Sequence, residues 1–177
     1  MLIRHALPAD ADVLAALAER LWRETYTGRI PAPDLEQHLA EAFGPAQQAA
    51  ELADPTCRTL LLEGGGNLLG YALLCAHGPA PGTSSAEFLK PLEVVRFYLD
   101  QSVHGTGAAR ELMEAALAEA AAAGHDGVWL QAWERSARAL RFYAKLGFRP
   151  VGTTTFRVGS LDYHDLVLVH GLEMPFA

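Results

Sequence analysis

The amino-acid sequence predicts an α/β protein, a three-layer sandwich with a mixed, mostly antiparallel central sheet of six or seven strands. Apolar runs of strand length alternate with segments of helical periodicity along the chain. Two of these runs, 58–63 and 68–76, are joined by a Gly-Gly-Gly-Asn segment at 64–67, and these residues tolerate the positive φ angles of a hairpin turn. Later strands are separated by helices, so the sheet combines a hairpin with crossover connections.

The N-terminal third is predicted to be mainly helical. Apolar residues recur there at helical spacing, and Pro, Gly and Asp residues mark the breaks. The expected elements are a strand at residues 2–6, a helix from Pro8 ended by Thr27-Gly28, a helix from Pro33 ended by Gly44-Pro45, and a helix over 47–53.

The C-terminal half alternates strands and helices. Ser136 is a candidate N-cap for one of these helices, and Gly147 stands where a left-handed residue ends it. Residues 78–85 are expected to form a flexible loop, and His164-Asp165 to mark the start of the last strand. The expected elements are a strand at 92–99, a helix over 111–123, a strand at 127–133, a helix over 136–146, and strands at 148–157 and 164–170.

Length and composition indicate one globular domain spanning residues 1–177. Half of the residues are hydrophobic and a fifth are charged. The sequence has no apolar run of membrane-spanning length and no N-terminal signal-peptide pattern, so we expect a cytoplasmic protein without a membrane partner. The net charge of −7 argues against nucleic acid as a partner.

The cysteines and histidines give no sign of a metal centre. Cys57 and Cys75 are isolated, without a CxxC pair or a disulfide framework, and Cys75 is expected to be a small buried hydrophobic residue. The seven histidines form no HxxH or HExxH pair. We therefore expect no metal site.

A turn at residues 104–109 lies between a predicted strand and a predicted helix. The N–H groups at such a helix N-terminus are unsatisfied and carry partial positive charge, so they can bind phosphate. No Lys follows the glycines, which excludes a P-loop, and Arg110 occupies the third glycine position of a dinucleotide fingerprint. A tight turn that only caps the helix is the alternative at this point.

Two motifs in order resemble the GNAT superfamily of acyl-CoA N-acyltransferases. The family's pyrophosphate loop has the form [QR]-x-x-G-x-[GA], and its second motif resembles N-x-x-A-x-x-F-Y-x-K-x-G-F. The resemblance runs from about residue 60 to 172, with His104 in place of Gln or Arg and Ser136 in place of Asn. The matching residues are His104, Gly107 and Ala109, then Ser136, Ala139, Phe142, Tyr143, Lys145, Gly147 and Phe148.

The resemblance implies acetyl-CoA as co-substrate. Strand 92–99 would pair with the pantetheine arm, provided that it diverges from strand 127–133. Tyr143 would be the general acid that protonates the thiolate of CoA, although an isolated Phe-Tyr pair is more often part of a core. The implied cofactor-binding residues are Phe97, Tyr98, Leu99, His104, Gly105, Thr106, Gly107, Ala108, Ala109, Ser136 and Tyr143.

The general base is less well defined by the sequence. Many relatives use a Glu on the strand before the phosphate loop. Glu93 lies on this strand, two residues before Val95 and on the same face, and could act directly or through water. Glu134, after strand 127–133, is the competing candidate.

The C-terminal part looks most like the PaiA-type branch, the polyamine N-acetyltransferases, in residues 128–134 and 155–159, followed by Asp165. Residues 24–26 and 34–36 also fit that branch. This resemblance implies a primary amine or polyamine acceptor, held by aromatic and acidic side chains. A core role for both tryptophans is an equal alternative. Other functions left open are a non-catalytic acyl-CoA-binding sensor and an acetyltransferase for amino acids or protein N-termini; a homodimer is also open. The candidate acceptor residues are Trp22, Tyr26, Trp133 and Glu134.

Overall fold

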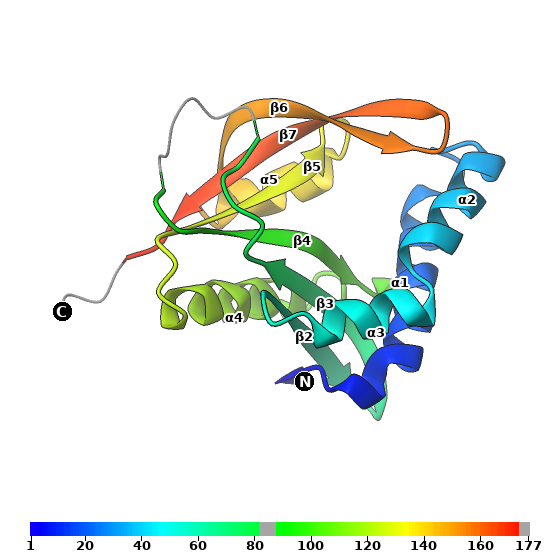
Figure 1. Cartoon of the computed structure of the whole chain (residues 1–177), viewed down its shortest axis with the longest axis horizontal. Helices are drawn as coiled ribbons and strands as arrows, with labels where there is room; N and C mark the ends of the chain where they lie inside the picture. Colours follow the sequence, from blue (N-terminus) through cyan, green and yellow to red (C-terminus); the bar gives the residue numbers. More distant parts are fainter. Residues whose placement is uncertain (82–87, 174–177) are drawn as a thin grey trace.

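The computed structural model describes residues 1–81 and 88–173. Within these residues a seven-stranded sheet has the order β1-β2-β3-β4-β5-β7-β6 (Figure 1). Only β4 and β5 pair in parallel, and the other neighbours are antiparallel. The predicted fold class is therefore confirmed. The strands are β1 (Leu2–His5), β2 (Cys57–Gly64), β3 (Asn67–Cys75), β4 (Pro91–Leu99), β5 (Gly127–Trp133), β6 (Arg149–Val158) and β7 (Leu161–Gly171).

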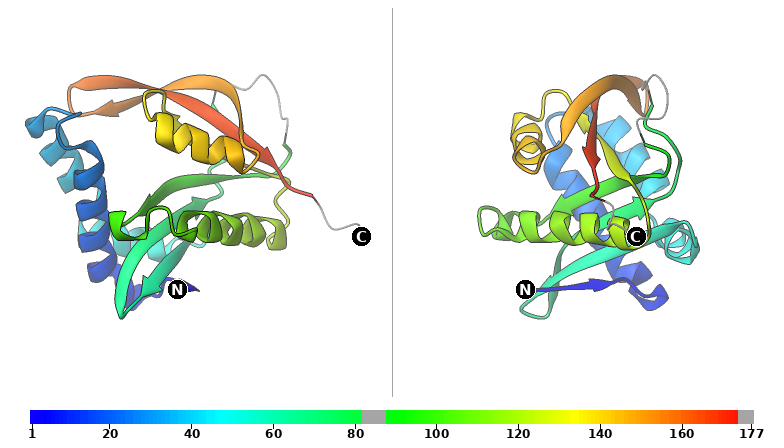
Figure 2. Two further views of the ribbon diagram at one scale, coloured as in Figure 1. Left: turned by 180° about the vertical axis from the view of Figure 1, so that it is seen from behind. Right: turned by 90° about the vertical axis from the view of Figure 1, so that its left-hand side faces the viewer.

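Helices lie on both sides of this sheet (Figure 2). Alternating residues of β2 show the division, since Leu60 and Leu62 pack in the cluster that contains α4 and α5, whereas Leu61 packs with α1 and α2. No helix in the described residues is both long and apolar enough to cross a membrane. The helices are α1 (Ala11–Tyr26), α2 (Ala32–Ala42), α3 (Pro45–Ala53), α4 (Ala108–Ala122) and α5 (Ala137–Lys145), with short 3₁₀ turns η1 (Pro8–Asp10) and η2 (Gln101–Val103).

The strands β4 and β5 part halfway along their length. Residues 91–94 of β4 pair with 127–130 of β5, and no pairing continues beyond Val94 and Leu130. A β-bulge in the β3–β4 ladder lies at the same level, between Leu73 and Leu74. The divergence that cofactor binding requires of these strands is thus present in the fold.

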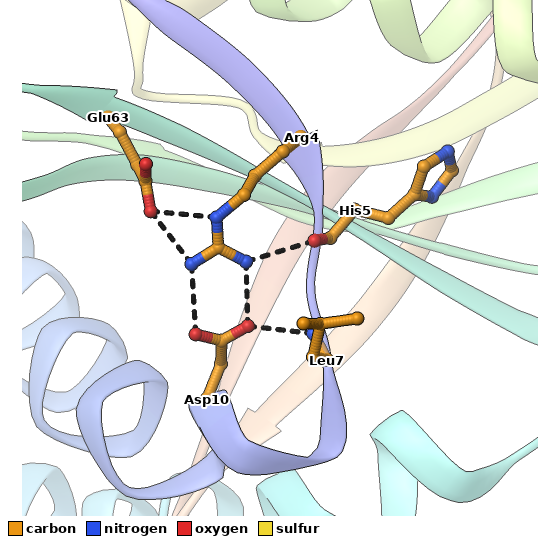
Figure 3. Close-up of polar contacts among 5 residues, drawn as sticks. All are labelled: Arg4, His5, Leu7, Asp10 and Glu63. Carbon is orange, nitrogen blue, oxygen red and sulfur yellow. Dashed lines mark hydrogen bonds and ion pairs between the residues drawn. The ribbon is translucent and has the colours of Figure 1, made fainter.

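The edge strand β1 is held by a network around Arg4 (Figure 3). The Arg4 guanidinium donates to both carboxylate oxygens of Asp10, at 2.7 and 2.9 Å, and its Nε donates to Glu63 at 2.8 Å. Asp10 also accepts the backbone N–H of Leu7. The hydrogen bond from Arg4 lowers the pKa of Asp10 below its usual value.

The structure corrects two expectations. Cys57 and Cys75 lie opposite each other in the β2–β3 register and form a disulfide, so these cysteines are not isolated, although Cys75 is buried as expected. His164 and Asp165 lie inside β7, which begins at Leu161, rather than at its start. Residues 78–81 of the loop expected at 78–85 belong to no helix or strand, and residues 82–85 lie outside the described residues.

Candidate functional site

The turn before α4 is open and built on glycine. Gly105 and Gly107 have φ angles of +80° and +95°, which disfavour any residue with a side chain. A Cβ at either position would meet nothing within 4 Å, so the space above the turn is free. Because α4 begins at Ala108, the N–H groups of its first turn lack partners four residues earlier in the helix.

Two side chains of the turn contact backbone carbonyl groups just before it in the chain. The Thr106 hydroxyl donates to the carbonyl of Val103 at 2.8 Å, and Nε2 of His104 lies 3.3 Å from the carbonyl oxygen of Leu99. His104 is exposed. The residue that replaces the family's Gln or Arg therefore links the turn to the end of β4.

The end of β4 carries the other expected cofactor residues. Phe97 and Leu99 face the α4–α5 cluster, and Tyr98 faces the α1–α2 cluster. The Phe97 ring stacks on Phe142 of α5, with centroids 5.7 Å apart. Since β5 has left β4 at this level, this part of the strand has a backbone edge without a partner strand on that side.

Tyr143 is buried on α5 among aromatic rings. Its ring meets Phe97, Phe142 and Phe148 edge-on, with centroid distances of 5.3 to 6.4 Å. Burial raises the pKa of the Tyr143 hydroxyl, so this group is protonated and able to donate at neutral pH. Ser136 is at the N-cap position of α5, but its side chain makes no capping hydrogen bond.

A pocket opens among aromatic side chains of α1, β5, β6 and β7. Three of the four predicted acceptor residues line it, namely Trp22, Tyr26 and Trp133. The Trp133 ring lies between Tyr26 and Tyr163, at centroid distances of 6.4 and 6.0 Å. Glu134 is exposed and outside the lining. The complete lining is Trp22, Tyr26, Ile30, Trp133, Phe156, Val158, Tyr163 and Asp165.

Asp165 is the charged residue of this lining. The resemblance to the PaiA-type branch includes Asp165, but Asp165 is not among the predicted acceptor residues. It lies opposite Trp133 in the β5–β7 register and is 8% exposed. Burial raises its pKa to about 6, and the charge of Glu134 contributes further. The alternation of Tyr163, Asp165 and Val167 on one face of β7 is the signal that could have indicated it.

Tyr26 of this pocket interacts with Tyr98 of β4 and with Tyr143 of α5. A hydrogen bond from Tyr98 lowers the pKa of Tyr26, against the larger rise that burial causes. The charge of Asp165 acts on Tyr26, and Tyr26 in turn raises the pKa of Tyr143. Tyr26 therefore interacts electrostatically with both the carboxylate of the pocket and the tyrosine of α5.

Glu93 is not brought together with these groups. Its carboxylate lies 2.9 Å from Nδ1 of His77, on the sheet face that carries Cys57 and Cys75. Burial raises the pKa of Glu93, and the hydrogen bond with His77 opposes that rise. The structure thus separates Glu93 from the aromatic pocket.

Comparisons with known proteins agree with this arrangement. The family model described as "Acetyltransferase (GNAT) family" matches residues 14–148. An uncharacterized N-acetyltransferase of Mycobacterium tuberculosis is 36% identical over 167 residues, covering 92% of this chain and 98% of that protein.

Solved structures share the fold at low sequence identity. The paiA N-acetyltransferase of Thermoplasma acidophilum, in complex with coenzyme A, has a TM-score of 0.78 at 19% identity, covering 96% of this chain and 98% of that one. The structure of yncA from Salmonella typhimurium with its cofactor acetyl-CoA has a TM-score of 0.66 at 20% identity, covering 100% and 96%.

The open turn before α4 and the divergence of β4 and β5 are features that the resemblance to acyl-CoA N-acyltransferases predicts. The chain belongs to the acetyltransferase (GNAT) family, and is an acetyl-CoA-dependent acetyltransferase of that type.

Proposed function

We propose that this protein transfers an acetyl group from acetyl-CoA to a primary amine of a small cationic molecule, with a polyamine as the leading candidate. The observation that carries the proposal is the aromatic pocket with one buried carboxylate, Asp165. Ring faces and a carboxylate together suit an ammonium group.

The donor is held by the turn and by the exposed edge of β4. The N–H groups of residues 104–109 bind the pyrophosphate, and the free edge of β4 near Phe97 and Leu99 pairs with the pantetheine arm. This placement leads the thioester toward Tyr143. Two proteins of the same fold hold coenzyme A and acetyl-CoA, which supports acetyl-CoA as the donor.

Desolvation in the pocket brings the pKa of the bound ammonium and the pKa of Asp165 closer together. The aromatic pocket raises the pKa of Asp165 to about 6 and lowers that of a bound ammonium, which reduces the cost of moving a proton between them. Asp165 first binds the ammonium and then takes its proton, directly or through water. In this scheme Asp165 replaces Glu93 as the proposed base, because Glu93 contacts His77 instead.

The neutral amine attacks the thioester carbonyl, and a β4 N–H group stabilises the oxyanion. When the carbon–sulfur bond breaks, Tyr143 donates its proton to the departing thiolate. The nitrogen, which still carries one proton more than an amide, passes that proton through water to the Tyr143 phenolate, which gives CoA, the acetylated amine and the restored hydroxyl. We also propose a cytoplasmic location, where acetyl-CoA is available.

Release of CoA thiol over a panel of acceptors tests the function. We expect turnover of spermidine, spermine or putrescine with kcat/KM values above those of amino acids, peptides with free N-termini and aminoglycosides. Failure of all three polyamines beside good turnover of another class would overturn the polyamine assignment alone. A homodimer remains a proposal, which light scattering of the same preparation would test.

Calorimetry with acetyl-CoA tests the cofactor site. Gly107→Glu adds bulk and negative charge at the turn and should abolish measurable binding. Gly66→Glu is the matched control, because Gly66 also has a positive φ, +79°, and open space around it, but lies in the β2–β3 hairpin. Equal affinity of the two variants would show that the donor binds elsewhere.

A further inference from the structure

Three neighbouring strands place two sulfurs and a carboxylate in one row. In the sheet register Cys57 of β2 is opposite Cys75 of β3, and Cys75 is opposite Glu93 of β4. Paired residues share a face of the sheet, so all three side chains lie on the same side. His77 follows Cys75 by two residues. One ligand atom from each of Cys57, Cys75 and His77 lies within 4.8 Å of the others.

The imidazole of His77 is oriented by Glu93. Nδ1 of His77 lies 2.9 Å from Oε2 of Glu93, and the side chains are 49% and 11% exposed, respectively. With Nδ1 bonded to a carboxylate, Nε2 is the nitrogen left for a metal ion. A carboxylate behind a histidine is the usual outer partner of a zinc ligand, since it fixes the ring and increases its basicity.

We propose that Cys57, Cys75 and His77 form a zinc site when the disulfide is reduced, with Glu93 as the outer partner of His77. Two thiolates and one imidazole are ligands that Zn²⁺ favours, and three protein ligands leave a fourth position for water. The half-exposed His77 gives an ion access from solvent, while the buried cysteines shield the other side.

The chemistry requires a reductant, for which we name a dithiol. The dithiol transfers two electrons and two protons to the Cys57–Cys75 bond and becomes a disulfide itself, leaving two thiols on the protein. Zinc binding then displaces the two thiol protons. A compartment that supplies acetyl-CoA keeps most protein thiols reduced, so the reduced pair is the form that would meet zinc there.

The site is separate from the acetyl-transfer machinery proposed above. None of its residues lines the aromatic pocket or belongs to the turn at 104–109. Loss of zinc binding and loss of acetyl transfer can therefore be measured independently.

Zinc titration of the full chain tests the site. The protein is reduced with a phosphine, desalted without oxygen, and titrated with zinc against a chromogenic chelator. We expect one zinc per reduced chain and none in the oxidised protein. Cys57→Ser, Cys75→Ser and His77→Ala should each weaken binding at least about 100-fold, and Glu93→Gln about 10- to 100-fold. Cobalt should give the thiolate charge-transfer absorption of a tetrahedral site.

His5→Ala is the matched control. Nε2 of His5 also lies near a glutamate, 3.5 Å from Glu119. Among the described residues, however, His5 belongs to no group of potential metal ligands that contains a cysteine. Its zinc affinity should equal that of the unaltered chain. If a cysteine variant fails to fold, the half-exposed His77 provides the deciding variant. Absence of stoichiometric zinc, equal binding by the oxidised protein, or unchanged affinity in His77→Ala would overturn the proposal.

Discussion

Asp10 and Asp165 lie in two environments that shift the pKa of an aspartate in opposite directions. Asp10 has its two oxygens matched by the Arg4 guanidinium, and its pKa is lowered. Asp165 lies among aromatic rings, its pKa is raised to about 6, and within residues 1–81 and 88–173 no ion-pair partner is found for it. The first carboxylate fastens a strand at the sheet edge.

The opposite pKa shifts distinguish a carboxylate that stabilises the fold from one that is available to a ligand. A paired carboxylate stabilises the fold, whereas a desolvated one without a cation costs stability until a ligand supplies the charge. Asp165 is therefore the group expected to gain when a cationic acceptor binds. The predictions below test this contrast, from the largest expected effect to the smallest.

Asp165→Asn should lower kcat/KM for the best polyamine about 100- to 1000-fold, because it removes both the anion and the proton acceptor. Acetyl-CoA affinity should stay unchanged in calorimetry. Asp162→Asn is the matched control: Asp162 lies on the same strand but is exposed and paired with Arg157 at 2.8 Å. Equal rates of the two variants would show that Asp165 is not part of acceptor recognition.

Tyr143→Phe should lower kcat about 10- to 1000-fold while leaving the affinity for acetyl-CoA nearly unchanged. The substitution keeps the ring packed against Phe97 and Phe142 and removes only the hydroxyl. Measurement requires saturating substrate and a rate-limiting chemical step. An unchanged kcat under those conditions would exclude Tyr143 as the general acid.

The pH profile should show the raised pKa of Asp165 directly. In the free enzyme kcat/KM should fall about tenfold for each pH unit below about 6, as the carboxylate becomes protonated. In Asp165→Asn this step should vanish, and activity should rise only at higher pH, where the amine itself deprotonates. A step near 6 that persists in the variant would belong to another group.

Stability should change in opposite directions for the two aspartates. Asp165 has a raised folded pKa, so its contribution is complete below the unfolded value and is lost as the pH rises through about 6. Asp165→Asn should therefore be about 1 to 3 kcal/mol more stable than the parent chain at pH 7, with a difference that disappears toward pH 4. Denaturant unfolding at both pH values measures this effect.

For Asp10 the sign is reversed. Its folded pKa is lowered, so its contribution is present above the unfolded value and is lost as the pH falls through the folded one. Asp10→Asn should cost about 1 kcal/mol at pH 7, since the Arg4 pair is partly exposed. Destabilisation by both substitutions at pH 7 would contradict the contrast between the two environments.

Local features of the fold could be predicted from the sequence, and long-range ones could not. The β2–β3 hairpin follows from glycines at 65 and 66, both with positive φ angles in the structure. The opposition of Cys57 and Cys75 depends on a register shift between Leu62 and Glu63, and without that bulge Cys57 would face Leu74. No local pattern in the sequence announces such a shift.

The proposed acceptor pocket could not be predicted as a whole for the same reason. The turn at 104–109 is a continuous segment and is recognisable as a motif, whereas the pocket joins α1, β5, β6 and β7. Trp133 meets Asp165 only because β5 pairs with β7, and Tyr26 joins them from the end of α1. The sequence indicated the aromatic residues one by one. The importance of the carboxylate depends on its burial, which is a tertiary property.

The smallest expected effect concerns Glu134, which lies outside the pocket lining but acts on Asp165 through its charge. Glu134→Gln should raise KM for spermidine about two- to fivefold, because an exposed carboxylate attracts the second ammonium only weakly and salt screens it. Hexylamine, which has only the reacting nitrogen, should show a smaller change. Glu119→Gln, at a partly buried site beside His5, should change neither value. Equal increases for spermidine and hexylamine would mean that Glu134 acts on Asp165 alone, and recognition of the second ammonium would then have to come from the aromatic rings.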